Sequence, residues 1–175
     1  EGGAEEQAIL DALEIEVGTP YGEEFKTAGE PGSRYISQAN EVDEMLQRMI
    51  AIADEVANAK IADPHTSENV LDVESWFSWN SLVDFQNNVR SIENAYLGGY
   101  VEGSRDKSIS DFVKEQDAAL DTEIRQKITA AINAIAAIPY PFRNNLTHDN
   151  VQSAMDAVNA LGQTIDTKVR PMVVD

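Results

Sequence analysis

The chain has 175 residues, no cysteine and a formal net charge of −18, from 31 acidic and 13 basic residues. This length suits one domain with a sizeable core, and the lack of cysteine excludes a disulfide framework and thiolate metal sites. The acidity disfavours binding to nucleic acid or to an anionic membrane surface. No stretch approaches the roughly 20 apolar residues of a membrane span.

Residues 1–33 are predicted to form an irregular N-terminal segment. A short helix could place Ile9, Leu13 and Val17 one turn apart, and the glycines and prolines that follow indicate a loop. The sequence starts at Glu1 and contains no signal segment. We therefore expect any targeting segment or lipid anchor to lie outside it.

Apolar residues at helical spacing predict helices near residues 34–61, 80–97, 108–138 and 148–168. Glycine and proline separate them: Pro64 interrupts the pattern and predicts a connector over residues 62–75, and Gly98 ends the second helix. The expected caps are Ser33 or Ser37, Ser108 with Asp111, and Thr147, and Pro171 should close the last helix. Four amphipathic helices bury their apolar faces together in an all-α, antiparallel four-helix bundle over residues 34–175.

The segment "SWFSWNSLVDFQNNVRSIENAYLGGY", residues 75–100, mixes apolar and short polar side chains. At about 100° per residue, one sector of its helix is apolar, and a second sector beside it is polar. We call the polar sector, together with the first residue of the predicted helix, the polar stripe: Asn80, Ser81, Asp84, Asn88 and Ser91. These side chains either bond to their own bundle or face a ligand or a second domain, and spacing alone leaves both interpretations open.

Asp84 is the most informative residue of the polar stripe. A carboxylate beside the core must be hydrogen-bonded or paired, and Arg90 points nearly the opposite way on the helix. We expect the partner to come from Ser81, from Asn88, from another segment or from a ligand.

The same segment resembles the signature of the imelysin-like family, S-x-N-S-x-x-D-F-x-x-N-x-x-S-I-x-N-x-Y-x-G. The matching residues run from Ser78 to Gly98. The stretches from Ile52 to Ile61 and from Ala130 to Phe142 also resemble members from Bacteroidetes, so the resemblance covers about residues 35–142. It implies an all-helical protein of two bundle-like halves, of which residues 34–175 resemble the second. It also implies a periplasmic or lipid-anchored location in the bacterial cell envelope and a role in iron uptake.

Members of this family are classed as metallopeptidases, and the site that the resemblance implies lies between the halves. It combines a G-x-H-x-x-E motif of the first half with polar residues of the second-half helix. This chain contains no such motif. His65 and Glu68 have the H-x-x-E spacing and are weak candidates for metal ligands, because Asp63 replaces the glycine; a site made of carboxylates alone is left open. We expect both to be ordinary loop residues and His148 to be a solvent-facing residue at a helix start.

The sequence thus favours a non-catalytic envelope protein that binds iron, another divalent metal or haem through the polar stripe. One alternative is a metallopeptidase whose G-x-H-x-x-E motif lies outside this chain. Another is a helical protein-interaction module without a small ligand. The expected partners are the first-half domain of the family or a second copy of the chain. Nucleic acid is not expected.

Overall fold

The computed structural model describes residues 25–100, 102–105 and 107–174. The chain divides into two compact units, Glu1–Glu41 and Val42–Asp175. The possible helix around Ile9 to Val17 lies outside the described residues. In the first unit the Ser37 hydroxyl accepts a hydrogen bond from the Asn40 amide at 3.1 Å, as expected of the residue that caps helix α3 (Gln38–Glu55).

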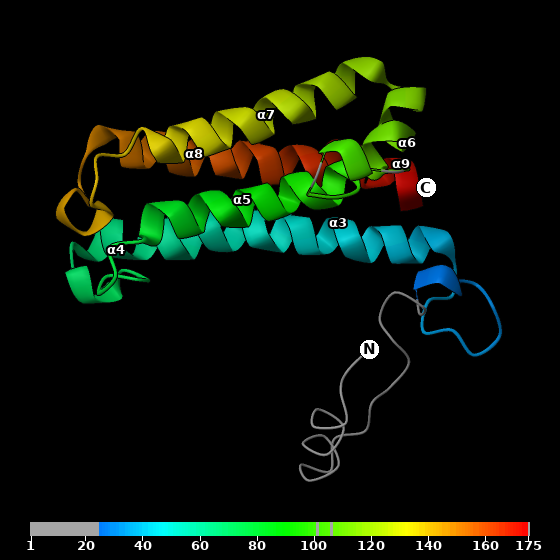
Figure 1. Ribbon diagram of the computed structural model, residues 1–175, viewed down its shortest axis with the longest axis horizontal. Coiled ribbons are helices and arrows are strands. Elements are labelled where there is room, and N and C mark those ends of the chain that lie inside the picture. The colour runs from blue at the N-terminus through cyan, green and yellow to red at the C-terminus, as the bar shows by residue number, and fades with distance from the viewer. Residues whose placement is uncertain (1–24, 101, 106, 175) are drawn as a thin grey trace, which may run out of the picture. The chain divides into compact units, whose positions relative to one another are not determined.

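Four long helices form the second unit, which contains most of α3 together with α5 (Ser81–Leu97), α7 (Ala118–Ala136) and α8 (Asp149–Thr164). They lie side by side, and the colours of Figure 1 show that successive helices run in opposite directions. The described residues contain no strand. The predicted all-α, antiparallel four-helix bundle is therefore confirmed.

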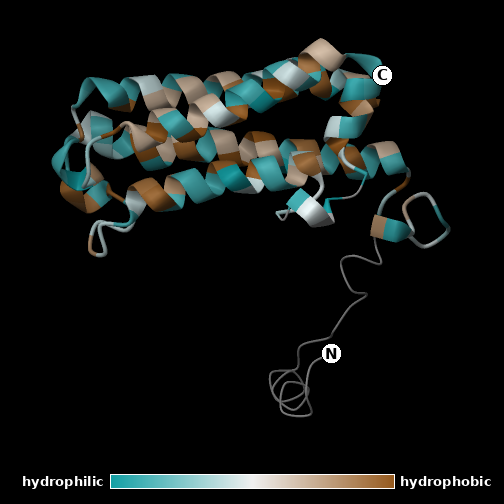
Figure 2. Cartoon of the chain, turned by 45° about the horizontal axis from the view of Figure 1, so that its top comes forward, coloured by the Kyte–Doolittle hydropathy of each residue, from teal (hydrophilic) through white to brown (hydrophobic). Residues whose placement is uncertain are grey.

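The apolar faces of these helices meet in one core. Hydrophobic and hydrophilic residues alternate around each helix in Figure 2, as amphipathic packing requires. Each fully buried Leu, Ile or Phe side chain contributes about 1.5–3 kcal/mol. The fully buried residues include Leu46 of α3, Phe85, Val89 and Ile92 of α5, Ile124, Ile128 and Ile135 of α7, and Val151, Val158 and Leu161 of α8.

The predicted connector over residues 62–75 is wrong in its first half. Helix α3 continues through a π-helical segment, Val56–Ile61, into α4 (Ala62–Ser67). Pro64 lies inside this helical path directly after the π-helical segment, where the regular i→i−4 hydrogen-bond pattern is already interrupted. The helical path ends at Glu68, whose φ of 54° lies in the left-handed region, and a 3₁₀ turn, Val70–Asp72, follows.

The predicted helix over residues 108–138 is two helices, α6 (Ile109–Gln116) and α7. Asp117 separates them with a φ of −149°, and its carboxylate accepts hydrogen bonds from the amides of Ala119 and Leu120, both at 3.0 Å. The capping box of Ser108 and Asp111 is confirmed. Asp117 therefore ends one helix and caps the next.

Three other helix ends test the predicted caps. Gly98 ends α5 with a φ of 77°, as predicted. His148 rather than Thr147 caps α8, because its Nδ1 accepts the Asn150 amide at 3.1 Å. A π-helical segment, Ile165–Val169, extends α8, and Pro171 begins a short helix, α9 (Pro171–Val174), instead of closing the last one. Short 3₁₀ turns at Glu102–Ser104 and Phe142–Asn144 complete the described elements.

Asp121 joins α5, α6 and α7 at one end of the bundle. This buried carboxylate accepts hydrogen bonds from Tyr96 (2.9 Å), from Ser110 and from Arg125 (2.9 Å). Burial alone would raise the pKa of Asp121, but these donors outweigh it and hold the pKa below its usual value. Burial together with the Asp121 charge raises the pKa of Tyr96. The carboxylate is therefore ionised at neutral pH.

A second ion pair joins the beginning of the bundle to its end. Asp43 of α3 accepts the Arg170 Nε at 2.6 Å, and Gln47 donates to the same carboxylate at 2.6 Å. The hydrogen bond from Arg170 lowers the pKa of Asp43. Within residues 25–100, 102–105 and 107–174, no helix is long and apolar enough to cross a membrane.

Candidate functional site

The loop of residues 73–80 precedes α5 and is held by the first turn of that helix. Ser81 is buried, and its hydroxyl donates a hydrogen bond to the backbone carbonyl of Glu74. A buried hydroxyl without a partner would cost about 1–3 kcal/mol. Ser81 therefore fixes the loop to the first turn of α5.

Asp84 holds the same loop one turn further along α5. Its half-buried carboxylate accepts hydrogen bonds from the Ser75 hydroxyl at 2.6 Å and from the Asn80 side-chain amide at 2.7 Å. The expected partner thus comes from the preceding segment. Arg90 bonds to Asn87 at 3.1 Å on another side of the helix, as its position predicts.

These bonds hold a loop whose backbone is unusual. Ser75 and Trp79 have φ values of 61° and 63°, in the left-handed region that residues other than glycine seldom adopt. Such conformations persist only where the surroundings enforce them. The Trp79 amide also donates to the Ser75 carbonyl at 2.9 Å, so the loop closes on itself above Asp84.

The outer part of the polar stripe differs from its inner part. Asn88 is half-buried, and among the described residues no group hydrogen-bonds to its side-chain amide. Ser91 is exposed and donates to the Asn88 backbone carbonyl at 2.6 Å. Asn80 is exposed and uses its NH₂ group on Asp84. Each interpretation of the polar stripe therefore fits one part of it. Ser81 and Asp84 bond within their own bundle, whereas the Asn88 amide is open to a ligand or a second domain.

Aromatic residues of this loop and of the turn before α8 form a contiguous row that sequence reasoning missed. The ring centroids of Trp76 and Phe77 lie 5.6 Å apart, and those of Trp79 and Tyr140 lie 6.5 Å apart. The Arg143 Cζ lies 5.4 Å from the Trp76 ring centroid and 5.7 Å from the Trp79 ring centroid. Arg143 also donates to the Trp76 carbonyl at 3.0 Å. We call these five residues the aromatic row. The W-x-x-W spacing of the loop was the available signal, but nothing in the sequence links it to residues 140–143.

The two candidate metal ligands are not brought together as a site. His65 lies on α4, not in a loop as predicted, and its Nδ1 is 2.6 Å from the Leu146 backbone carbonyl. Glu68 is exposed at the left-handed end of α4. His148 is exposed at the start of α8, as predicted. In the part of the chain that the structure describes, no three His, Asp or Glu side chains are placed to hold one ion.

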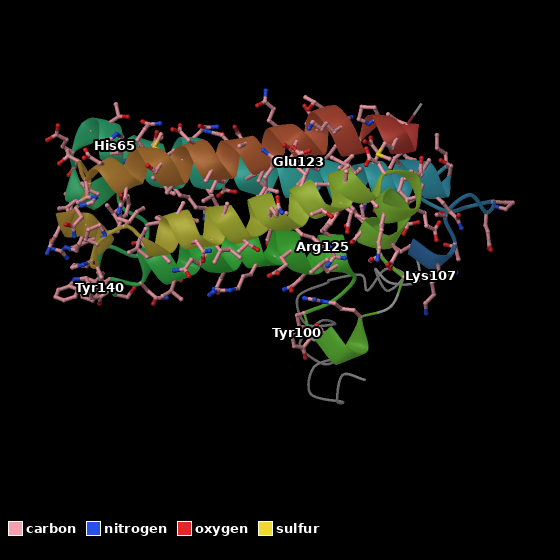
Figure 3. All side chains as sticks on the ribbon, turned by 90° about the horizontal axis from the view of Figure 1, so that it is seen from above. His65, Tyr100, Lys107, Glu123, Arg125 and Tyr140 are labelled. Carbon is pink, nitrogen blue, oxygen red and sulfur yellow. The ribbon has the colours of Figure 1, made fainter. Side chains whose placement is uncertain are left out.

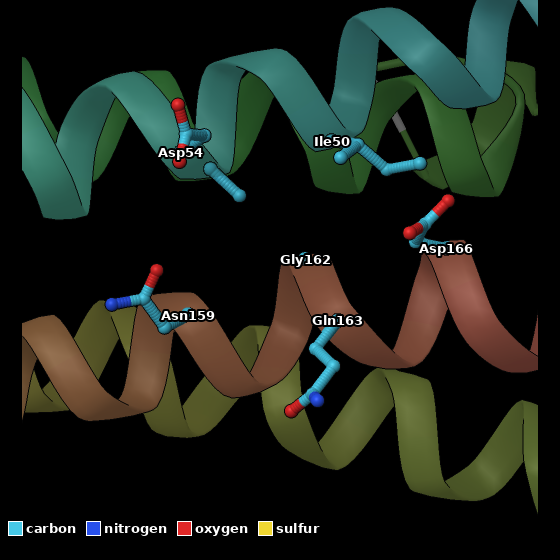
Figure 4. A pocket seen from close by; sticks show the side chains of 7 residues that line it. Ile50, Asp54, Asn159, Gly162, Gln163 and Asp166 are labelled. Carbon is cyan, nitrogen blue, oxygen red and sulfur yellow. The ribbon is translucent and has the colours of Figure 1, made fainter.

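A groove of about 300 Å³ lies between α3 and α8. In Figure 4, Ile50 and Asp54 of α3 lie on one side of the groove, and Asn159 and Gly162 of α8 with Asp166 of the π-helical segment lie on the other. The helices approach closely here, because a Cβ on Gly162 would lie 3.0 Å from that of Ala53. Asp166 is paired with Arg170 at 3.5 Å, so its charge is already partnered.

Comparison with known proteins gives consistent matches. The family model described as Imelysin, of the peptidase M75 type, matches residues 6–167. The chain is 28% identical over 151 residues to iron-regulated protein A of Synechococcus elongatus, which covers 84% of this chain and 42% of that protein.

Two solved structures share this fold. An imelysin peptidase from Bacteroides ovatus is 34% identical, with a TM-score of 0.83 over 92% of this chain and 47% of its own. A protein named as an iron-regulated protein A precursor, from Parabacteroides distasonis, is 34% identical, with a TM-score of 0.80 over 89% of this chain and 48% of its own. This chain thus spans about half the length of the relatives that it matches.

Proposed function

Because the chain belongs to the imelysin family, we propose that it acts by binding, as part of an iron-acquisition protein of the bacterial cell envelope. The iron-related role is supported by two matched relatives named as iron-regulated protein A. The envelope location is supported by the name of the second, a precursor, since proteins that are exported are commonly made in a longer form.

The open outer part of the polar stripe is the observation that carries the binding role. The half-buried amide of Asn88 makes no hydrogen bond within the described residues, next to the Asp84 carboxylate one turn away. The Asn88 amide is accessible to solvent, so a ligand or a second domain can bond to it without breaking a contact of the bundle. The held loop keeps Asp84 in place beside it.

The chemistry of the polar stripe favours an iron-bearing ligand with oxygen-rich surroundings. Carboxylate, amide and hydroxyl oxygens are the ligands that hard cations prefer. Asp84, the one carboxylate of the polar stripe, already accepts two hydrogen bonds from the loop, so the oxygen donors to iron would come mainly from a chelate or from another protein segment. We propose that the half of the relatives that this chain does not match supplies such a segment, since those relatives are about twice as long as this chain. We place that companion half, or a second copy of the chain, opposite Asn80, Asn88 and Ser91.

A peptidase remains the second candidate, because one matched structure is named an imelysin peptidase. The G-x-H-x-x-E motif would then belong to the companion half, since the sequence of this chain lacks it. Cleavage of a peptide by this chain, inhibited by a chelator and lost in His65→Ala, would favour the peptidase over the binding protein. If no substitution in the polar stripe weakens the binding of iron or haem, a helical interaction module would be favoured.

Titration with ferric citrate, ferrous iron and haem tests the proposal. We expect at least one to bind the purified chain, and Asn88→Ala to weaken that ligand about tenfold, as the loss of one good polar contact would. Asn133→Ala is the matched control, because Asn133 is an exposed amide on α7. The melting temperature of both variants should stay unchanged. Equal affinity in Asn88→Ala and wild type, or no binding of any of the three, would contradict the proposal.

A further inference from the structure

The aromatic row leaves large apolar side chains in solvent. Phe77 is 84% exposed, Tyr140 is 67% exposed and Trp79 is 46% exposed. The ring contacts described above make these residues one continuous surface with Trp76 and Arg143. Contiguous exposed apolar surface marks an interaction site more often than single exposed residues do.

This surface is held in place before any partner arrives. Ser81, Asp84 and Arg143 all hold the loop, through Glu74, Ser75 and the Trp76 carbonyl. Holding bulky aromatic groups rigidly reduces the entropy lost on binding. Trp, Tyr and Arg are also the residue types that dominate the binding energy of protein interfaces.

The charge near the aromatic row determines which class of partner can bind there. Four acidic residues and no lysine or arginine occur in residues 62–74, which lead into the loop: Asp63, Glu68, Asp72 and Glu74. Lys60 pairs with Glu74 at 2.7 Å, and Arg143 belongs to the aromatic row itself, so these six charged residues together carry a net charge of −2. The whole chain carries −18. At this surface, an anionic membrane and nucleic acid would be repelled, and a second copy paired through it would bring the same acidic segments against each other.

We propose that the aromatic row docks a basic protein partner, one that presents lysine or arginine side chains around an apolar contact. Cationic side chains are attracted to exposed aromatic faces, and the acidic residues of the segment 62–74 match a basic rim. This inference concerns a surface other than the polar stripe. It stands or falls separately from iron or haem binding.

Intrinsic fluorescence reports on this surface directly, because the two tryptophans of the chain, Trp76 and Trp79, both lie in the aromatic row. The probes are a short helical peptide of Ala, Leu and Lys, and the same peptide with Glu in place of each Lys. The test variant is Phe77→Ala. Its matched control is Tyr100→Ala, since Tyr100 is 81% exposed and lies beyond the far end of α5, about 26 Å along the helix. Figure 3 shows Tyr100 well apart from Tyr140 of the aromatic row.

We expect the lysine peptide to shift the tryptophan emission of wild type and Tyr100→Ala at the same concentrations. Phe77→Ala should need about ten times more peptide, as for a hot-spot residue. The glutamate peptide should have no effect, and high salt should weaken the lysine peptide. Phe77→Lys, which places a positive charge on the same surface, should weaken the lysine peptide further than Phe77→Ala does.

Equal binding of the lysine peptide to Phe77→Ala and Tyr100→Ala would overturn the proposal, because it would show attraction to the acidic chain as a whole. Binding of the glutamate peptide would overturn the charge argument. A dimer in sedimentation that Phe77→Ala dissociates would assign the surface to a second copy instead. Co-sedimentation with vesicles of phosphatidylcholine and phosphatidylglycerol, lost in the same variant, would assign it to a membrane. Tryptophans already shielded from acrylamide in a longer form of the protein would assign it to the companion half.

Discussion

Replacing Asp84 by alanine should release the loop that carries the aromatic row. The change removes two hydrogen bonds to a carboxylate, from Ser75 at 2.6 Å and from Asn80 at 2.7 Å. Hydrogen bonds to charged groups contribute about 1.5–3 kcal/mol each. Because Asp84 is half-buried and Asn80 is exposed, water replaces part of each bond, and about 1 kcal/mol per bond is the better figure.

The free energy of unfolding should therefore fall by about 2 kcal/mol, which for a chain of this size lowers the melting temperature by about 4–8 °C. Urea unfolding followed by circular dichroism measures the first quantity. Tryptophan emission should shift to longer wavelength in the native variant, because Ser75 and Trp79 no longer need their left-handed conformations.

Asp156→Ala is the control for lost charge, because Asp156 is exposed on α8 and bonds to Gln152 alone among the described residues. It should change the free energy of unfolding by less than about 0.5 kcal/mol. An Asp84→Ala variant as stable as Asp156→Ala, with unchanged tryptophan emission, would refute the idea that Asp84 holds the loop.

Three further substitutions test how the bundle is held. Asp121→Asn should lower the free energy of unfolding by about 2–4 kcal/mol at pH 7, because a buried carboxylate with three donors is lost. Since folding lowers the pKa of Asp121, its stabilisation is present above the unfolded pKa of about 3.9 and is lost as the pH falls through the folded pKa; wild type should lose stability more steeply than Asp121→Asn in acid urea titrations. Asp117→Ala should cost about 1 kcal/mol in urea unfolding, because two helix-start amides lose their acceptor. Gly98→Ala should lower the melting temperature by an amount matching about 1 kcal/mol, because alanine is strained at a φ of 77°.

The sequence was sufficient for the parts of the fold that depend on local periodicity. The apolar spacing of Leu82, Phe85 and Val89 places them on one face of α5, and all three are buried. The cap at Ser108 and the stop at Gly98 follow from residue types that suit those positions. These features involve residues within a few positions of one another.

The errors arose where a local signal had two meanings. Pro64 indicates a break, but directly after the π-helical segment it is compatible with a helix. Asp117 looks like one more polar residue on a helix until its carboxylate is seen to cap α7. Thr147 and His148 are neighbours, and only the backbone path decides which of them caps α8.

The candidate site depended on contacts that the sequence could not supply. The helical wheel placed Asp84 beside the core, but its partner Ser75 lies in a loop whose path is set by left-handed residues. The aromatic row joins Trp79 to Tyr140 and Arg143, about 60 positions later in the chain. Such pairings follow from the packing of the whole bundle, because no local pattern connects the two segments.

The central claim is that the outer polar stripe binds an iron-bearing ligand, and paramagnetic broadening of backbone amide signals tests it most directly. Ferric iron broadens the NMR signals of nearby amides. On adding ferric citrate or haem, the signals of Asn80, Asp84 and Asn88 should broaden first, while those of Thr167 and Lys168, in the segment that extends α8, stay sharp. Broadening centred on the groove of Asp54 and Asp166, or spread evenly over the acidic surface, would contradict the account.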